Sequence, residues 1–285
     1  MKISAVSLSK KIVVITGGSS GIGREFAKLS MECGASVVIC SNDKERLADA
    51  LSYLKTFGSD IDARACDIRN KEEVEGLARY CASRYGHVDI LVNNAGFAVY
   101  RPFEESSLEE SLDILDVNLS GSMRCAKAFL PGMIARRQGR IVNISSIGGE
   151  LIITPNAAYC AAKHGIVAWS KAIRHELAQF NIAVNVVCPG YVKTHFHDHA
   201  TFRRRDPYRK KGRLTPNLER VSKGILSAIL RDRVVTYVPS WLGLVVWCFD
   251  TFPFVMNPLW KQVMKRRTAQ LYYQIEEERK SELRP

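Results

Sequence analysis

Tyr159 and Lys163 are a pair of side chains that can transfer protons. They lie four residues apart, so on a helix they share one face, one turn from each other. A free tyrosine has a pKa near 10, too high for a base near neutrality, and a neighbouring ammonium favours its phenolate form. The spacing therefore predicts a tyrosine with a lowered pKa that acts as general acid or base. Taken alone, it also fits an ordinary exposed pair on a helix.

A glycine-rich segment, Thr16–Gly23, follows the first apolar run and precedes a helical pattern. Its glycines allow a sharp backbone turn and a close approach to a pyrophosphate, whose charge a helix N-terminus stabilises. This strand–turn–helix context predicts nucleotide binding. The alternative is a glycine-rich turn that binds no ligand.

Short runs rich in β-branched residues alternate with longer amphipathic stretches. The predicted strands include Lys11–Thr16, Ser36–Cys40, Ile90–Asn93, Arg140–Ser145 and Ala183–Cys188. The predicted helices include Lys44–Phe57, Lys71–Tyr85 and Ser122–Arg136. The strands are almost continuously apolar, as expected when helices cover both faces of a parallel sheet. Residues 1–240 are thus predicted to form an α/β domain, a single doubly wound (Rossmann) parallel sheet with helices on both faces.

The order and spacing of several motifs resemble the fingerprint of the short-chain dehydrogenase/reductase family. The glycines fit T-G-x-x-x-G-x-G and not G-x-G-x-x-G. The further matches, in chain order, are Asn93-Asn94-Ala95-Gly96, Asn118, Ser146, Tyr159-x-x-x-Lys163, Pro189-Gly190 and Thr194. The resemblance extends roughly from Ser9 to Val238, and chance does not explain the ordered set.

The resemblance implies an oxidoreductase that moves hydride between a nicotinamide cofactor and an alcohol or carbonyl. Tyr159 would be the acid or base, Lys163 would favour its phenolate, Ser146 would bind the substrate oxygen, and Asn118 would hold a water that relays protons. Ser145 is the competing serine, but the spacing to the tyrosine favours Ser146. The implied cofactor-binding residues are Gly17, Ser19, Ser20, Gly21, Ile22, Gly23, Ser41, Asn42, Asp67, Ile68, Asn94, Ala95, Gly96, Tyr159, Lys163, Pro189, Gly190, Val192 and Thr194.

The end of the second strand bears on the choice of cofactor. NAD-preferring members of the family usually carry an acid there, for the ribose hydroxyl. This sequence has Ser41 and Asn42, with Lys44, Arg46 and Arg24 close in the sequence. Because no acid repels a 2′-phosphate, NADP(H) is favoured. NAD(H) is the alternative, which Asp43 supports. Asp67, after the third strand, would contact adenine or cap its own loop.

Charge and cysteine content restrict the partners. The chain has 41 Lys and Arg against 29 Asp and Glu, a net charge of +12. This surplus suits a phosphorylated cofactor or an acidic lipid surface. No nucleic-acid motif accompanies it, so no nucleic-acid partner is expected. The eight cysteines form no C-x-x-C pair and are interpreted as buried, reduced thiols. Met1–Ser9 lacks the apolar core of a signal peptide, which predicts an intracellular protein that is not secreted.

A histidine-rich segment, His195–His199, and a basic run, Arg203–Arg213, follow Thr194. The proposed chemistry needs no metal, so we expect no metal site and interpret the segment as a substrate loop with incidental histidines. The basic run fits a solvated surface or contact with anionic lipid.

Residues 241–285 are predicted to form an apolar and basic C-terminal extension, helical in character. Val234–Phe249 carries no charge and contains Trp241 and Trp247, and prolines and Asp250 interrupt the segment before it reaches the roughly 20 residues of a spanning helix. A peripheral or monotopic segment in the membrane interface is therefore favoured, on the endoplasmic reticulum if the source is eukaryotic. A homodimer interface and a lid over the substrate pocket are the alternatives.

This extension resembles, more weakly, the C-terminal part of membrane-associated family members that act on steroids, retinoids and other lipids. We therefore predict an NADP-preferring enzyme that interconverts a ketone or aldehyde and an alcohol on a lipophilic steroid, retinoid, sphingoid or long-chain lipid. A soluble reductase of small or acyl-linked carbonyls is the first alternative. The second is a catalytically idle nucleotide-binding scaffold, which the complete set of catalytic residues disfavours.

Overall fold

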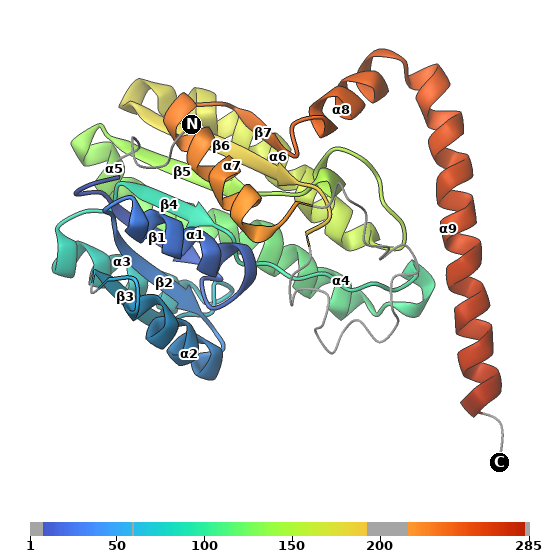
Figure 1. Cartoon of the computed structure of the whole chain (residues 1–285), viewed down its shortest axis with the longest axis horizontal. Coiled ribbons are helices and arrows are strands. Elements are labelled where there is room, and N and C mark those ends of the chain that lie inside the picture. The colour runs from blue at the N-terminus through green and yellow to red at the C-terminus, as the bar shows by residue number, and fades with distance from the viewer. Residues whose placement is uncertain (1–7, 59, 193–215, 283–285) are drawn as a thin grey trace.

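A seven-stranded parallel sheet forms the centre of the computed structural model, which describes residues 8–58, 60–192 and 216–282 (Figure 1). The strand order is β3-β2-β1-β4-β5-β6-β7, and all six neighbouring pairs are parallel. The strands are β1 (Ile12–Thr16), β2 (Ser36–Ser41), β3 (Ile61–Ala65), β4 (Ile90–Asn93), β5 (Gly139–Ile144), β6 (Ile182–Pro189) and β7 (Val235–Val238). The predicted doubly wound α/β fold is confirmed.

Helices cover both faces of the sheet. One face packs against α1 (Gly21–Glu32), α2 (Lys44–Lys55) and α7 (Leu218–Arg231), and the other packs against α3 (Lys71–Tyr85), α5 (Ser122–Arg136) and α6 (Ala157–Leu177). Successive strand side chains point to opposite faces. Val13 and Ile15 accordingly join the first apolar core, while Ile12 and Val14 join the second. Two covered faces explain why β1 is apolar at almost every position.

The chain between β4 and α5 contains an irregular helical turn. Helix α4 (Leu108–Leu115) continues into a π-helical turn, Asp116–Gly121, which leads directly into α5. Asn118 lies in this turn and is completely buried. Such turns insert an extra residue into a helix and recur at functional sites.

Two helices follow β7, so the uncharged run Val234–Phe249 is divided between a strand and a helix. These helices are α8 (Leu242–Thr251) and α9 (Pro253–Glu282), and α9 runs along one side of the domain (Figure 1). In the described part of the chain, no single helix is long and apolar enough to cross a membrane. Helix α8 and the part of α9 up to Glu277 meet that criterion only together, with a bend of 118° between them.

Candidate active site

A cavity of about 820 Å³ lies at the carboxyl ends of strands β1 to β6. In open α/β sheets this edge carries the ligand, at the point where the strand order reverses. That point falls between β1 and β4. The predicted residues that line the cavity are Gly17, Ser19, Ser20, Gly21, Ile22, Ser41, Asn42, Asp67, Ile68, Asn94, Ala95, Gly96, Ser146, Tyr159, Lys163, Pro189, Gly190 and Val192. Gly23 and Asn118 support the lining from behind, and Thr194 lies outside the described residues.

The turn between β1 and α1 requires glycine at two positions. Gly17 has a φ of +63°, and a Cβ there would stand 2.8 Å from the Cα of Ala95. A Cβ on Gly23 would stand 2.4 Å from the carbonyl oxygen of Gly17. Asn94 Nδ2 donates to the carbonyls of Thr16, at 3.0 Å, and Gly17, at 3.1 Å. These two hydrogen bonds from Asn94 fix the backbone of the glycine turn.

The N-terminus of α1 faces this cavity and suits an anionic ligand. Its N-cap, Ser20, makes no side-chain capping hydrogen bond, and no acid lies in the first turn. The partial positive charge of a helix N-terminus stabilises phosphate groups. The tight glycine turn and this helix end fit the pyrophosphate of a dinucleotide.

Polar groups at the end of β2 form the next part of the wall. Ser19 Oγ donates to Ser41 Oγ at 3.1 Å. Asp43 caps α2 by accepting from the backbone N–H of Arg46 at 3.0 Å, and its carboxylate is 3.2 Å from the Arg46 guanidinium. Since Asp43 is engaged in this way, its charge is partly neutralised.

Asp67 both lines the cavity and caps its own loop. Its Oδ1 accepts from the backbone N–H of Arg69 at 2.9 Å, and the two side chains form an ion pair at 2.6 Å. Hydrogen bonds from Arg69 hold the pKa of Asp67 below its usual value. Arg69 also pairs with Asp113 at 2.7 Å, which the sequence did not predict.

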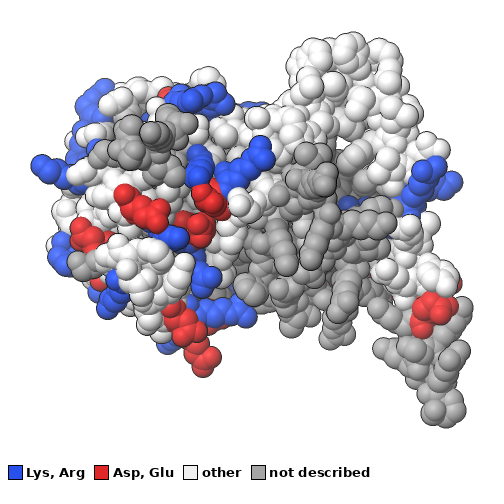
Figure 2. All heavy atoms as spheres, in the orientation of Figure 1, with Lys and Arg blue, Asp and Glu red and all other residues white. Residues whose placement is uncertain are grey.

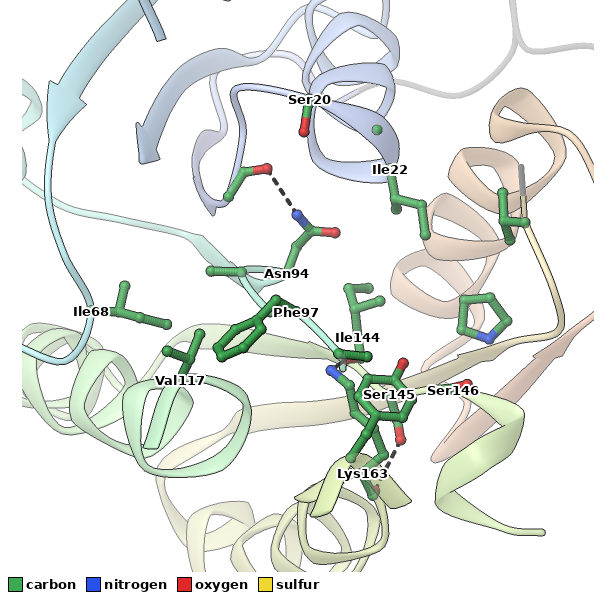
Figure 3. Close-up of a pocket in the computed structure, with 18 of the residues that line it drawn as sticks. Ser20, Ile22, Ile68, Asn94, Phe97, Val117, Ile144, Ser145, Ser146 and Lys163 are labelled. Carbon is green, nitrogen blue, oxygen red and sulfur yellow. Dashed lines mark hydrogen bonds between the residues drawn. The ribbon is translucent and has the colours of Figure 1, made fainter. Parts of the chain in front are cut away.

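The predicted catalytic residues converge where β5 meets α6. The Lys163 Nζ lies 5.6 Å from the centre of the Tyr159 ring and donates to the carbonyl of Ile144 at 3.0 Å. The Ser146 hydroxyl forms a hydrogen bond to Tyr159. Ser145 instead donates to the carbonyl of Lys163 at 3.0 Å and anchors α6 (Figure 3). The two adjacent serines thus have different partners.

Burial dominates the proton affinity of the pair. Burial raises the pKa of Tyr159 to about 12, although the Ser146 hydrogen bond opposes the increase. Burial lowers the pKa of Lys163 to about 8. The expectation of a lowered tyrosine pKa therefore does not hold for the protein without its cofactor, because burial of Tyr159 outweighs the hydrogen bond from Ser146 that opposes it. The phenol is protonated at neutral pH.

Asn118 presents a buried acceptor beside this pair. Its Nδ2 donates to the carbonyls of Phe97, at 2.7 Å, and Ile114, at 3.0 Å. Its Oδ1 has no hydrogen-bond partner among the described residues. A Cβ on Gly96 would stand 2.4 Å from this oxygen and 3.5 Å from Lys163 Nζ. Gly96 therefore keeps open a space that both polar atoms border.

Helix α9 contributes Arg267 to the cavity wall, which the sequence motifs did not predict. Trp260 Nε1 donates to the carbonyl of Ile152 at 2.7 Å, and Thr268 Oγ1 lies 3.3 Å from Thr154 Oγ1. Leu271 and Ile275 pack against Tyr100 in a small buried cluster.

The lining residues that were missed at this end are Phe97, Tyr100, Ile147, Ile153, Asn156, Tyr191 and Arg267. The helical spacing of Trp260, Met264, Thr268, Leu271 and Ile275 is the signal that could have located the attached face.

Comparison with known proteins identifies the family. Residues 11–204 match the model of the short chain dehydrogenase family, so the chain belongs to that family. A putative ketoacyl reductase of Streptomyces coelicolor is 42% identical over 186 residues, covering 65% of this chain and 71% of the relative. A dehydrogenase/reductase SDR family protein 7-like of Anopheles gambiae is 31% identical over 277 residues, covering 94% and 86%. The crystal structure of a substituted actinorhodin polyketide ketoreductase with NADPH superposes with a TM-score of 0.72 at 34% identity, covering 82% and 97%.

These findings confirm the predicted class of enzyme and of cofactor. The protein is an NAD(P)-dependent oxidoreductase of the short-chain dehydrogenase family. The scaffold alternative is thereby disfavoured further. The Anopheles relative matches 94% of the chain, whereas the Streptomyces relative matches 65% of it.

Proposed function

We propose that this protein is an NADP-preferring enzyme that interconverts a lipophilic ketone or aldehyde and its alcohol. The observation that carries the proposal is the convergence of Tyr159, Lys163 and Ser146 on a cavity that begins at the glycine turn. A nicotinamide cofactor bound along this cavity supplies or accepts the hydride. The chain's own residues provide binding, orientation and the proton.

Tyr159 transfers the proton to or from the substrate oxygen. Its protonated phenol is the form needed to donate to the carbonyl oxygen during reduction. Ser146 hydrogen-bonds to Tyr159 and lies on the same cavity, so its hydroxyl is placed to bind the same oxygen. The Oδ1 of Asn118 and the Nζ of Lys163 border one space beside Gly96, which suits a water that resupplies the tyrosine with protons.

Replacing Tyr159 tests this assignment directly. Tyr159→Phe removes only the hydroxyl, and we expect turnover to fall by at least about 100-fold while NADPH binding stays within a few-fold. The measurements are steady-state rates on a panel of steroid, retinoid, sphingoid and acyl carbonyls, and NADPH titration by fluorescence. Tyr85→Phe, which removes a hydroxyl bonded to Asp62, is the control. Retention of more than about a tenth of the rate in Tyr159→Phe would exclude the role.

The preference for NADP rests on the absence of an unpaired acid after β2. Ser41 and Asn42 line the cavity, and Asp43 is held by the N-terminus of α2 and by Arg46. Arg46 also lines the cavity, where its charge attracts a 2′-phosphate. NAD remains the alternative cofactor.

The lipophilic substrate is supported by the apolar side chains that follow Ser146 in the cavity lining, among them Ile147 and Ile153. The Streptomyces relative is described as a putative ketoacyl reductase, which favours acyl-linked carbonyls as the second candidate substrate class. The substrate panel distinguishes the two classes by kcat/KM.

We also propose that α8 and the start of α9 bind the surface of an anionic membrane. Trp241 and Trp247 are 46% and 54% exposed, and Phe254 and Leu259 are 76% and 55% exposed. Basic residues follow on α9, and the region of α8 is almost free of charge on the face drawn in Figure 2. Tryptophan near lipid headgroups with flanking cations is typical of interfacial segments.

Flotation with liposomes tests membrane binding. Wild type should float with anionic liposomes at low salt and in part at high salt, because the apolar contribution is not screened. Trp241→Ser combined with Trp247→Ser should abolish flotation. Tyr53→Ser combined with Phe57→Ser, which removes exposed aromatics from α2 and the turn after it, should leave it unchanged. Wild type that stays at the bottom of the gradient at both salts would instead favour a homodimer contact on this face.

A further inference from the structure

The charged residues that line the cavity are distributed unevenly between its two ends. Among the described lining residues, the acids are Asp43, Asp67 and Asp113, and all of them lie at the adenosine end. There they pair with Arg46 and Arg69. At the tyrosine end, the described lining contains no acid. The cations of the described lining at this end are Lys163 and Arg267.

Arg267 of α9 is the second of these cations. Its Nε donates to the hydroxyl of Tyr100 at 3.2 Å, and its guanidinium lies 5.4 Å from the centre of the Tyr100 ring. Tyr100 is buried and packs against Leu271 and Ile275, one and two turns further along the same helix as Arg267. Burial raises the pKa of the Cys160 thiol, and the positive charge of Arg267 opposes this increase. Cys160 directly follows Tyr159 in α6, so the charge of Arg267 acts close to Tyr159.

The neighbouring lining residues define what else the ligand must contain. Ile147, Ile153 and Val192 provide apolar surface in the cavity lining. A ligand that fills this end thus meets an apolar wall, a proton donor at Tyr159 and a guanidinium at Arg267. A guanidinium fork matches the two oxygens of a carboxylate or phosphate better than any neutral group does.

We propose that Arg267 is a specificity-determining residue and that the substrate is an apolar carbonyl compound bearing an oxyanion, a carboxylate or a phosphate, away from the reacting carbon. This inference rests on the proposed function, because it names the substrate class of the same site. It also gives α9 a second role besides membrane contact. The attached face of the helix selects the substrate, while its exposed face is left for lipid.

The test compares matched acids and esters. Medium-chain oxo fatty acids, with the oxo group at successive positions, are assayed beside their methyl esters with NADPH. Wild type should prefer the best acid over its ester by at least about tenfold in kcat/KM, because hydrogen bonds to charged groups are worth about ten- to a hundredfold. Phosphate monoesters of hydroxy ketones of matched length show which oxyanion is bound better.

Variants on α9 assign the preference to one side chain. Arg267→Met should reduce kcat/KM for the acid by at least about tenfold and change that for the ester by less than about threefold. Arg267→Lys should retain part of the preference, since it keeps the charge without the fork. Arg266→Met, one residue away and exposed, should behave like wild type. Equal losses for acid and ester in Arg267→Met would overturn the proposal and leave Arg267 a structural residue.

A measurement on the unmodified protein covers the case in which Arg267→Met does not fold. An alkyl carboxylate or alkyl phosphate should inhibit wild type competitively at a concentration at least about tenfold lower than the alcohol of the same length. Equal inhibition by all three would overturn the proposal. If wild type reduces only neutral ketones, the proposed function stands and this inference fails. If Tyr159→Phe remains active, the proposed function itself fails.

Discussion

The two ends of the cavity are built in different ways. At the cofactor end, backbone turns and short side chains from consecutive strand–helix units form the wall, and the glycine turn is held by Asn94. At the substrate end, part of the wall comes from α9, which is far away in the sequence and is attached through side chains. The cofactor end is therefore fixed by the same packing that forms the fold. The substrate end depends on contacts that can change without altering the sheet.

The largest effect is expected when the attachment of α9 is weakened. Leu271 is fully buried against Tyr100 and Ile275, and truncating a buried leucine costs about 2–5 kcal/mol. Leu271→Ala should raise KM for the substrate by at least about tenfold and leave the Kd of NADPH within about twofold. Steady-state kinetics and fluorescence titration measure the two quantities. Leu259→Ala, on the same helix but exposed, should change neither. An equal increase in KM for the substrate and in the Kd of NADPH would show that the two ends of the cavity are not independent.

A smaller effect is expected from a charge at the cofactor end. Ser41→Asp places a carboxylate where a 2′-phosphate would bind, and repulsion should lower the NADPH to NADH ratio of kcat/KM by about tenfold. Ser52→Asp adds the same charge on the exposed side of α2 and should leave the ratio unchanged. KM for the carbonyl substrate should not move in either variant. A wild-type ratio already in favour of NADH would contradict the proposed preference.

The smallest effect concerns Lys163, which lies between the two ends. Because burial lowers its pKa to about 8 from an ordinary 10.5, charging it in the folded state destabilises the fold below pH 8. That destabilisation diminishes as the pH rises from 8 to 10.5, where the unfolded chain also loses the proton. Lys163→Met should therefore raise Tm by a few degrees at pH 7 and by less at pH 10, while turnover is lost. Calorimetry at both pH values checks this, and a decrease in Tm at pH 7 would contradict it.

The motifs predicted to bind the cofactor are local in the sequence, and the structure brings them together in the lining of one cavity. The predicted strand Ile90–Asn93 and helices Lys71–Tyr85 and Ser122–Arg136 match the structure at both ends. The predicted strand Ala183–Cys188 extends to Pro189 in β6, where it pairs with Val238 of β7. That partner strand was hidden in the uncharged run Val234–Phe249, because composition alone does not distinguish a buried strand from an apolar helix.

The substrate end was not predictable in the same way. Arg267 stands in a run of basic residues that resembles a solvated surface, and only the folded chain brings it to Tyr100. The pKa of Tyr159 also depends on burial, which spacing does not report. Sequence spacing placed Tyr159 and Lys163 one turn apart on the same helix, but burial in the folded protein determines the pKa of each group.

The π-helical turn Asp116–Gly121 makes this part of the chain sensitive to length as well as to residue type. An α-helix rotates by about 100° for each residue. Adding a residue to a regular α-helix would rotate everything after it by that angle, whereas the wide π-helical turn absorbs the extra residue and leaves α5 in phase with α4. Cys125 and Phe129 therefore stay on the face that packs on the sheet, and Asn118 lies in the widened turn, where its Nδ2 donates to the carbonyl of Phe97. Deleting one residue would restore the narrow turn and keep α5 packed, so the length of this segment determines the position of Asn118 and not the fold.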